Sequence, residues 1–525
     1  MDRKVYKLVP INNIMVFIRK KARAKAIYLY LVSNNWVKGK VKQKVIAYLG
    51  REENLPNVLL DSIKMKKLLN SDVENLSYQA PLALWNLAQE IGITKIFSDN
   101  LRKKAWGVPA SIASTLMMLN YTMESRSKDK LSRWYEQTYL KHIAKVHPSK
   151  LNSDLLYRTL DFFSEEKIEK IHEEIFKKAK EKFNLSEEIT TYDVTAILFE
   201  GNHCSLAKRG YNAEALYKLQ ANLGLAVTNE RFPVAHKTFE GNIKDVTTFD
   251  KMINLLDKTI NLNNTIFIFD RGIFSEENKQ KILSRGSKYI SGLRKYPEIK
   301  SLINSAKEED FKHADEKTLF YELLGEERKI IFWNKKMALE KIKEREKRLN
   351  KIEDKLKKLD PKRYEEKRLY EKVGEITRKY GKYFKIDYKT FSIERDEDEI
   401  ENEKQMDGKS VLVTNTDLSV EMVLKRYHDK NFIGMSFKDL KMFVDIRPIR
   451  HWKDNRVLAH IFLAVIAFGL RSLLELKLRR AGLEITAQEA LEQLGKVRVL
   501  CSDKQIIKVT GEDETTRKIM KKLAV

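Results

Sequence analysis

The sequence predicts a mixed α/β protein of several domains, and three observations carry this prediction. The chain has 525 residues, more than a single domain normally contains. Within residues 186–300, three strand-like segments, a helical segment and a further apolar strand follow one another, as in an α/β sheet. Helical spacing of apolar residues dominates 81–185 and 416–480. Hydrophobic residues make up 42% of the chain, enough for sizeable cores.

Residues 1–80 are predicted to form a small, basic, strand-rich N-terminal unit. The segments AIYLYLV and KVIAYLG alternate apolar and polar residues, as half-buried strands do. Asn34-Asn35 lies between these segments and is expected to form the turn that joins them.

Residues 81–185 are predicted to form a helical domain. Apolar side chains recur with helical spacing in PLALWNLAQEIG, ASIASTLMML and SEEKIEKIHEEIFKKAKEKF. Ser164, with Glu165 and Glu166 behind it, is typical of a helix N-terminus. No segment has the clear pattern of a helix-turn-helix.

Residues 186–300 change to the pattern of an α/β sheet. The predicted strands are EITTYDVTAILFEG, QANLGLAVT, FPVAHKTFEGN and the almost wholly apolar NTIFIFDRG, with the helix DVTTFDKMINLLDKTI before the last of them. Gly241, Asn242 and Asp245 in FEGNIKD predict a turn and a helix start.

Residues 336–380 are predicted to form an exposed, charged helical hairpin. Ile342, Leu349 and Leu356 recur every seven residues, Pro361 ends the first helix, and RLYEKVGEITRKY begins the second. A solvated charged face accounts for the many Lys and Glu residues.

The C-terminal part of the chain is predicted to be mostly helical over residues 416–480. The run VLAHIFLAVIAFGL is shorter than a membrane span and contains His460, so a buried core helix is expected. Arg447, Pro448 and His451 in DIRPIRHW fit a structural turn at a helix end. Residues 481–525 are expected to form a small unit of helix and strand.

The chain carries a net charge of +26, which favours a nucleic acid partner. Cations that replace condensed counterions on nucleic acid gain affinity from counterion release. An anionic membrane surface or simple solubility would also account for this charge, but the excess runs along most of the chain. The basic N-terminal unit would suit a DNA-contacting arm or an ordinary basic hairpin, and the helical domain could read DNA ends.

Cysteine content and the N-terminus predict a cytoplasmic protein without a membrane partner. Cys204 and Cys501 are too few for a disulfide framework or a four-ligand zinc site. The segment MDRKVYKLVPINNIMVF has no long apolar core and no small-residue cleavage site.

Two aspartates lie in strand-like, apolar settings. Asp193 is inside TYDVTAILF, and Asp270 closes TIFIFD before the turn Arg271-Gly272. Carboxylates in such settings are unfavourable without a partner, and a divalent metal is a natural one. Two carboxylates on neighbouring strands can hold two Mg²⁺ ions roughly 3.5–4 Å apart, an arrangement suited to phosphodiester displacement. Taken singly, each aspartate could instead cap a turn or pair with a lysine.

Residues 190–201 and 208–295 resemble the transposases of the IS-four superfamily, in its branch with a long N-terminal region. The matching stretches are TTYDVTAILFEG, KRGYNAEALYKLQANLGLAVT, FPVAHKTFEGNIKDVTTF and FIFDRGIFSEENKQKILSRGSKYISGLRK. The opening residues MVFIRKKARAKAIYLYLV and KVKQKVIAYLG also resemble that branch, as does the stretch YHDKNFIGMSFKDLKMFVDIRPIRHWKDNRVLAHIFLAVIAFGL.

The resemblance implies an RNase H-like catalytic core with a β-rich insertion. Residues 186–300 would form the first part of the core and residues 301–415 the insertion, which carries the helical hairpin 336–380. Residues 416–480 would supply the C-terminal helices of the core. Asp193 and Asp270 would be the first two catalytic carboxylates and ligands of two Mg²⁺ ions, which Mn²⁺ can replace.

The family also has a helical signature, Y-x2-R-x3-E-x6-K, whose Glu completes the metal site. The matching positions here are Tyr427, Lys430, Gly434 and Lys441, so Lys replaces Arg and the Glu is absent. At 100° per residue these four positions share one helix face. Tyr427, Lys430 and Lys441 are expected to contact DNA phosphates, although a surface-exposed lysine pair is an equal alternative.

No nearby acid replaces the missing Glu in a continuous helix. Asp429 and Asp439 each lie five residues from Gly434, roughly 140° off the signature face. We therefore expect a lost catalytic Glu and impaired or absent strand cleavage. The rival is an acid brought in by tertiary structure, with Glu421 and Asp445 as poor candidates. His451 or His460 as a general base is not required by two-metal chemistry.

The function implied by the resemblance is DNA transposition. The enzyme would bind terminal inverted repeats as a dimer, hydrolyse the phosphodiester at each end and join the 3′-OH to target DNA. An alternative is a non-catalytic, transposase-derived protein that occupies element ends, which the absent Glu favours. A plain metal-dependent nuclease fits the two carboxylates but not the resemblance along the chain.

Overall fold

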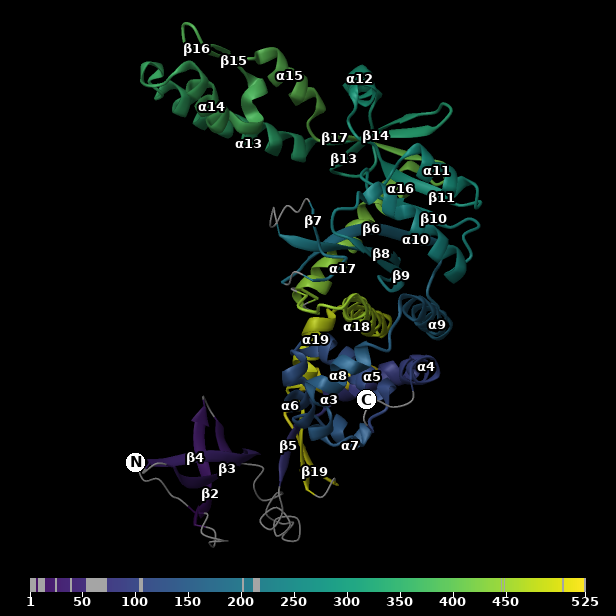
Figure 1. Cartoon of the computed structure of the whole chain (residues 1–525), viewed down its shortest axis with the longest axis vertical. Coiled ribbons are helices and arrows are strands. Elements are labelled where there is room, and N and C mark those ends of the chain that lie inside the picture. Colours follow the sequence, from purple (N-terminus) through teal and green to yellow (C-terminus); the bar gives the residue numbers. More distant parts are fainter. Residues whose placement is uncertain are drawn as a thin grey trace.

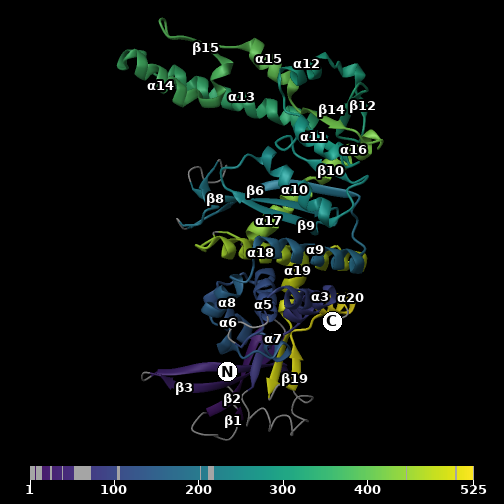
Figure 2. The ribbon, with the colours of Figure 1, turned by 45° about the vertical axis from the view of Figure 1, so that its right-hand side comes forward.

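The computed structural model describes residues 6–7, 15–23, 26–37, 40–52, 73–102, 107–200, 203–210, 218–444, 446–447, 449–502 and 505–523. Two small sheets lie beside each other at one end of the molecule, and a helical domain, a large sheet and a helical arm follow along its long axis (Figures 1 and 2). The helical domain and the large sheet enclose one long apolar helix between them.

The N-terminal unit is a four-stranded antiparallel sheet in the order β1-β2-β3-β4. Its strands are β1 (Tyr6–Lys7), β2 (Met15–Arg23), β3 (Ala26–Val37) and β4 (Lys40–Arg51). The predicted turn at Asn34-Asn35 is wrong, because β3 runs through both residues and Asn34 pairs with Gln43 of β4. The alternation of apolar residues stops before these asparagines, but backbone pairing with both neighbouring strands carries β3 further.

The helical domain begins after the short strand β5 (Glu74–Ser77). Its helices are α3 (Gln79–Ile91), α4 (Ile93–Asn100), α5 (Ala110–Met123), α6 (Lys128–Glu136), α7 (Leu140–Ala144), η2 (Pro148–Lys150), α8 (Ser153–Leu160) and α9 (Glu165–Phe183). The predicted helix start at Ser164 is confirmed, since its side chain accepts a hydrogen bond from the Lys167 N–H, 3.3 Å away.

The C-terminal residues return to the beginning of the helical domain. Strand β5 pairs with β18 (Arg498–Ser502), which pairs with β19 (Gln505–Thr510). The helices α19 (Ala487–Gly495) and α20 (Glu514–Leu523) complete this unit, and α19 packs on α3. Leu500 of β18 also packs among Leu29, Leu31 and Ala47 of the N-terminal sheet. Segments more than 400 residues apart therefore share one sheet and one core.

The large sheet has the strand arrangement of an RNase H-like core. Its central order is β9-β8-β6-β10-β11, in which β6, β8 and β9 are antiparallel and β10 and β11 run parallel to β6. The bounds are β6 (Ile189–Leu198), β7 (Lys208–Arg209), β8 (Leu219–Thr228), β9 (Pro233–Glu240), β10 (Ile266–Phe269) and β11 (Lys288–Gly292). The predicted strands and the predicted mixed α/β fold are confirmed.

Two helices follow strands of this core. The helix α10 (Asp245–Thr259) follows β9, and α11 (Glu276–Leu283) follows β10. The turn predicted from FEGNIKD is confirmed. A Cβ atom at Gly241 would come within 1.9 Å of the Gln220 carbonyl oxygen, so this close approach requires glycine.

The predicted insertion extends the sheet beyond β11 and carries the arm. The strand β17 (Lys409–Thr414) pairs with β11, and the order continues through β14 (Arg328–Asn334), β13 (Thr318–Leu323) and β12 (Lys312–His313). Before these strands lie α12 (Pro297–Ser305) and η3 (Glu308–Asp310). The strands of the insertion therefore join the sheet of the core.

The arm leaves the sheet between β14 and β17 (Figure 1). It consists of α13 (Lys335–Lys357), η4 (Pro361–Arg363), α14 (Glu366–Thr377), η5 (Arg378–Tyr383), β15 (Phe384–Asp387), β16 (Ser392–Arg395) and α15 (Glu397–Met406). The predicted helical hairpin is present, and Leu349 and Leu356 pack against Leu369 and Val373. The arm thus has an apolar core of its own.

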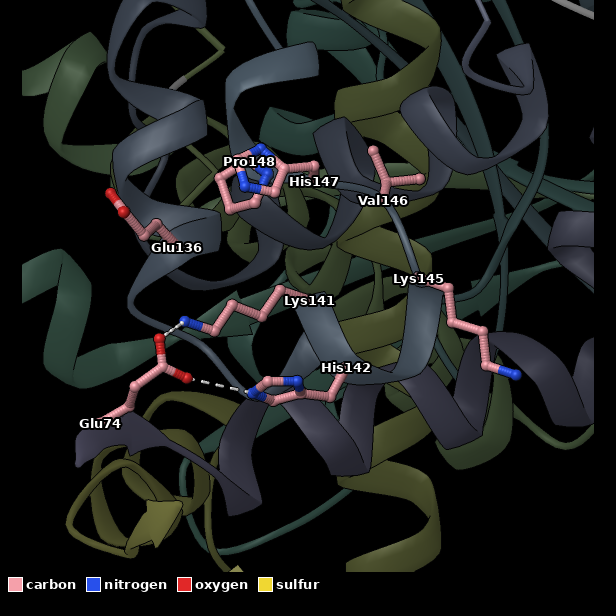
Figure 3. A pocket seen from close by; sticks show the side chains of 8 residues that line it. All are labelled: Glu74, Glu136, Lys141, His142, Lys145, Val146, His147 and Pro148. Carbon is pink, nitrogen blue, oxygen red and sulfur yellow. Dashed lines mark hydrogen bonds and ion pairs between the residues drawn. The ribbon is translucent and has the colours of Figure 1, made fainter. Parts of the chain in front are cut away.

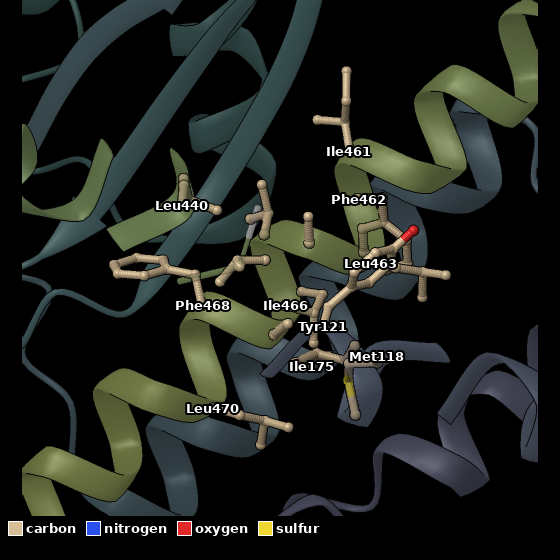
Figure 4. Close-up of a cluster of buried hydrophobic side chains, with 14 of the residues drawn as sticks. Met118, Tyr121, Ile175, Leu440, Ile461, Phe462, Leu463, Ile466, Phe468 and Leu470 are labelled. Atoms are coloured by element: carbon tan, nitrogen blue, oxygen red, sulfur yellow. The ribbon is translucent and has the colours of Figure 1, made fainter. Parts of the chain in front are cut away.

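The long apolar helix α18 (Asp454–Arg480) lies between the helical domain and the sheet (Figure 4). It is the one helix among the described residues that is long and apolar enough to cross a membrane, and 94% of its most apolar window is buried inside the protein. Phe462, Ile466 and Phe468 pack in the same cluster as Met118 and Ile175 of the helical domain. The predicted buried core helix is confirmed.

A buried histidine pair joins the helical domain to the sheet. The Nδ1 atoms of His172 on α9 and His236 on β9 are 2.8 Å apart, and His172 Nε2 lies 3.2 Å from the Pro233 carbonyl oxygen. Because the carbonyl can only accept, His172 Nε2 carries the proton and His236 Nδ1 donates to His172 Nδ1. Burial lowers the pKa of His172 to about 4 and that of His236 well below its usual value.

Acidification is therefore expected to weaken the packing of α9 on the sheet. Unfolded histidines bind protons near pH 6.5, whereas the folded pair stays neutral. Stability should therefore fall as the pH drops from about 6.5 to about 4, by up to about 1.4 kcal/mol per pH unit for each histidine. Thermal unfolding at several pH values would measure this slope. The double variant His172→Gln/His236→Gln should show a shallower slope, whereas exposed His313→Gln should not; equal slopes in all three proteins would contradict the assignment.

Candidate active site

Asp193 and Asp270 face the same side of the sheet. Tyr192 donates a hydrogen bond to Thr248 Oγ1 of α10 at 2.7 Å, so its neighbour Asp193 points to the opposite face. Ile189 lies four residues before Asp193 and therefore on the same face of β6, where it packs with Val423. Ile266 and Ile268 of β10 belong to the same cluster, which places Asp270 on this face as well.

The strand register places the two carboxylates beside each other. In the parallel pair β6 and β10, Ile266 aligns with Ile189 and Ile268 with Thr191. The ladder ends at Ile268 and Thr191, and continuing its register by two residues brings Asp270, which directly follows β10, beside Asp193 of β6. The two charges interact, since Asp270 contributes to the raised pKa of Asp193.

The two carboxylates have opposite electrostatic settings. Burial raises the pKa of Asp193 to about 7, although its carboxylate accepts the Val194 N–H at 2.8 Å. Burial also acts to raise the pKa of Asp270, but the Lys430 ammonium outweighs it and the pKa is lowered. Lys430 Nζ lies 3.0 Å from Asp270 Oδ1. Among the described residues, Asp193 has no ion pair of this kind. A bound cation would therefore stabilise the charged form of Asp193 more than that of Asp270.

Replacing Asp193 with Asn is expected to stabilise the metal-free protein at neutral pH. An unfolded aspartate loses its proton near pH 4, whereas Asp193 in the folded protein holds it to about pH 7. The contribution of Asp193 to the free energy of unfolding should therefore decline from about pH 4 to about pH 7, opposite in sign to the contribution of the histidine pair. Melting curves with a chelator should show Asp193→Asn a few degrees more stable at pH 7.5 and unchanged at pH 4. A lower midpoint at pH 7.5 would refute this reading.

Tyr427 and Lys430 lie against the two aspartates' face of the sheet. They belong to the end of α16 (Val420–Asp429) and to the residue that follows it. Lys430 Nζ is 3.3 Å from the Tyr427 hydroxyl and 4.4 Å from the centre of its ring. A Cβ atom at Gly292 of β11 would come within 2.4 Å of that hydroxyl, so glycine allows Tyr427 to approach the sheet.

The prediction of one continuous helix through the signature is wrong. The chain forms α16 and then α17 (Asn431–Met442), with a break at Lys430 where i−3 bonds replace the i−4 pattern. Val420, Val423 and Leu424 pack on the sheet's Ile268 cluster, whereas the buried face of α17 packs with α18. At 100° per residue these two apolar faces would diverge by more than about 100° in one straight helix.

Gly434 lies on the exposed side of α17, which packs beside β6. A Cβ atom built at this position meets nothing within 4 Å. Close packing therefore does not require glycine here, and the position has room for a longer side chain. Lys441 lies in the last turn of the same helix.

The other acids of this region have different surroundings. Asp439 forms an ion pair with Arg231, which also reaches Glu475 of α18 at 3.3 Å. Glu421 is exposed in the first turn of α16, and Asp445 lies outside the described residues. Asp439 is thus engaged away from the two aspartates, in agreement with the expectation that it does not replace the missing Glu.

Asp245 is an acid near the aspartate pair that the sequence analysis interpreted only as a helix start. It begins α10, and its charge contributes to the raised pKa of Asp193. Burial raises its own pKa as well. The sequence shows that Asp245 is the first residue of the helix after the third core strand. Only the folded sheet shows that this position lies near Asp193.

The donor chemistry of Asp193 and Asp270 fits hard divalent cations, which prefer carboxylate oxygens. Within the residues that the structure describes, no three His, Cys, Asp or Glu side chains are grouped so that they could hold an ion.

His451 precedes α18 and His460 is part of it, and both side chains contact the helical domain rather than the aspartates. His460 Nε2 is 3.1 Å from the Ile446 carbonyl oxygen, and its Nδ1 is 2.9 Å from the Tyr121 hydroxyl. The His451 ring lies 5.2 Å from that of His460. Both histidines are therefore part of the interdomain packing. Arg447 lies in the segment between α17 and α18, and Pro448 lies outside the described residues.

A polar hollow lies beside α7, in a part of the molecule away from the aspartates (Figure 3). Glu74 of β5 pairs there with Lys141 and lies 3.3 Å from His142 Nε2. The pairing joins β5 to α7. We read it as a structural contact, because Glu74 offsets the charge of the cations that line the hollow.

Comparison with known proteins identifies the central part of the chain. Residues 184–470, more than half of the chain, match the family model described as transposase DDE domain. No curated protein sequence matches the chain.

Solved structures of transposases match the chain at low sequence identity and low TM-score. The piggyBac transposase synaptic complex with hairpin DNA, determined by cryo-electron microscopy, is similar with a TM-score of 0.42 and 9% identity over 79% of each chain. A pre-cleavage Mos1 transpososome and a Mos1 paired-end complex with the left transposon end both give TM-scores of 0.15, at 12% and 14% identity. They cover 34% of this chain and 58% and 57% of theirs. Because these TM-scores are below 0.5, the family assignment rests on the family model.

Proposed function

Because the chain belongs to the transposase DDE domain family, we propose that it is the transposase of an insertion sequence of the IS-four superfamily. It binds the terminal inverted repeats of its element as double-stranded DNA. It acts as a homodimer, because two DNA ends must be held together. Its place of action is the cytoplasm. The observation that supports the proposal is the position of Asp270 at the end of β10, the strand that runs parallel to and beside β6 with Asp193, in an RNase H-like sheet.

The proposed reaction has two phosphoryl-transfer steps, which are slow in this chain because Gly434 stands where the family signature has its metal-binding Glu. Water first attacks the phosphodiester at each end of the element, and the bond to the 3′ oxygen breaks, leaving a 3′-OH. That 3′-OH then attacks a phosphodiester of the target DNA: the 3′ oxygen of the element bonds to the phosphorus, and the bond to the target's own 3′ oxygen breaks, leaving a target 3′-OH. No covalent enzyme intermediate forms. Asp193 and Asp270 would hold two Mg²⁺ ions, or Mn²⁺ in their place, which supply electrophilic stabilisation of the attacking and leaving oxygens.

The cationic residues of the signature would position the DNA. Lys430 already lies on the aspartate face of the sheet, 3.0 Å from Asp270. Once a cation is bound to Asp270, the Lys430 ammonium is available for a phosphate oxygen of the element end. Tyr427 supports Lys430 through its hydroxyl and ring, and Lys441 would contact the backbone farther along α17.

A second candidate function is a transposase-derived protein that binds element ends without cutting them. Gly434 favours it, because the family signature has its metal-binding Glu at this position. Such a protein would occupy the ends and compete with an intact transposase. The net charge of +26 suits both candidates.

The experiment that tests the proposed function compares two duplexes at one stated salt concentration: the element's terminal repeat and a shuffled duplex of equal composition. Specific recognition predicts an affinity ratio of about 10³ or more. Equal affinity for the two duplexes would overturn both candidates. Binding with strand cleavage in Mg²⁺ or Mn²⁺ selects the transposase, and binding without cleavage selects the end-occupying protein.

A further inference from the structure

Trp452 is an unusually exposed tryptophan. Its side chain is 70% exposed, whereas Trp85 and Trp134 are buried and Trp333 is half-buried. An indole ring in water leaves a large apolar surface unburied, and such rings are enriched where proteins contact partners.

The backbone around Trp452 is held in place by the core. Ile449 forms a β-bridge with Phe199, just past the end of β6, and its carbonyl accepts the Glu200 N–H at 2.9 Å. Two residues after Trp452, the Asp454 carboxylate accepts a hydrogen bond from the Ser205 N–H at 3.0 Å. Trp452 therefore projects from a segment anchored at both ends, which lowers the entropy cost of a contact with a partner.

The surroundings of the ring are aromatic and basic. The His203 ring lies 6.2 Å away at 62°. Arg450 and Lys453 are exposed on either side of Trp452 in the chain, and Glu200 pairs with Arg450 at 3.0 Å. An aromatic face beside cations is the combination that binds unpaired nucleotides, in which the base stacks on the ring and the cations hold phosphates.

The position of Trp452 suits DNA that reaches the aspartate pair. Phe199 lies six residues beyond Asp193, which corresponds to about 20 Å along an extended strand. At 3.4 Å per nucleotide this is about six nucleotides of DNA. A strand held at Asp193 and Asp270 could therefore extend to Trp452.

We propose that Trp452 is a stacking platform for an unpaired base of the DNA, with Arg450 and Lys453 holding the adjacent phosphates. This inference rests on the proposed function, namely that the chain binds DNA. A second copy of the chain is a weaker occupant, because the cations beside the ring would meet another protein of net positive charge.

The test uses the full chain and two DNA probes, the single strand dT20 and the terminal-repeat duplex. Binding of dT20 should quench tryptophan emission in the natural chain, and Trp452→Phe should lose most of that quenching. Trp452→Ala should weaken dT20 binding about 5- to 150-fold, as expected for the loss of about 1–3 kcal/mol of stacking. Trp452→Phe should stay within about threefold in affinity. Leu324→Ala, which removes an apolar side chain that is 80% exposed, is the matched control and should bind dT20 as the natural chain does.

The outcomes separate the two proposals. If the natural chain binds the duplex but dT20 binding and quenching do not depend on Trp452, the stacking platform is overturned and the proposed function stands. If it binds neither probe, the proposed function fails. If Trp452→Ala turns a dimer into a monomer in sedimentation without changing dT20 binding, a second copy covers the ring and the platform is likewise overturned.

Discussion

Gly434→Glu is expected to give strand cleavage of terminal-repeat DNA at a rate at least about 10³-fold above that of the natural chain. A carboxylate that completes a two-metal site contributes several kcal/mol to the stabilisation of transition-state charge, and each 1.36 kcal/mol is a factor of ten in rate. The measurement is the appearance of nicked 3′-OH ends with Mg²⁺ and then with Mn²⁺.

The structure has room for this substitution. A Cβ atom at position 434 meets nothing within 4 Å, so the added side chain displaces no neighbour. Replacing an interior helical glycine with Glu should also stabilise α17 by about 0.5 kcal/mol. Lys430, four residues earlier, reaches Asp270, and α17 packs beside the strand that carries Asp193. The new carboxylate would therefore enter from a helix already placed against the site.

Two controls isolate the role of the carboxylate. Gly434→Gln has nearly the same shape without the charge and should remain inactive, as should Gly434→Glu combined with Asp270→Ala. Cleavage by the natural chain at the rate of Gly434→Glu would show that another acid completes the site. Asp245 is then the first to test, since its charge interacts with that of Asp193, and Asp245→Asn should abolish that cleavage.

Arg345→Met is expected to loosen the helical arm strongly. Arg345 of α13 pairs with Asp407, which follows α15, and their side chains are only 9% and 8% exposed. The pair thus joins the middle of α13 to the point where the chain re-enters the sheet before β17. Removing one partner leaves the Asp407 charge buried without its cation, which typically costs about 3–5 kcal/mol. Hydrogen exchange of α13 and α15 amides should become about 10²- to 10³-fold faster.

The effect of Arg345→Met should remain confined to the arm. Leu349, Leu356 and Leu369 form a core separate from that around α18, so α18 amides should keep their protection. Arg348→Met is the matched control on the same helix, because Arg348 is exposed and water screens its contacts with Glu344 and the Tyr380 hydroxyl. Equal acceleration of exchange by both variants would show that the buried Arg345–Asp407 pair stabilises the arm no more than the exposed Arg348–Glu344 pair does.

Local patterns in the sequence were sufficient for most elements of the fold. The strand alternation and apolar runs around Asp193 and Asp270 predicted β6 and β10, and Ser164 predicted the start of α9, because these signals act within a few residues. Local signals failed at Asn34-Asn35 and at Lys430. At the asparagines, pairing with the neighbouring strands of the hairpin sheet decides the backbone, and at Lys430 the packing of α16 and α17 on different surfaces does.

By itself, the sequence determined the α/β class, the two strand aspartates and the Gly at signature position 434, since these depend on residue identity and short-range periodicity. Only the tertiary structure decided that Asp193 and Asp270 lie side by side, through the register between strands 77 residues apart. It also decided that α16 and α17 divide at Lys430, that Asp245 lies near Asp193, and that Trp452 is exposed beside the end of β6. Strand register, the division of a helix and the exposure of a side chain depend on which surfaces of the chain bury against each other. A local sequence pattern does not show which distant surface a segment will contact.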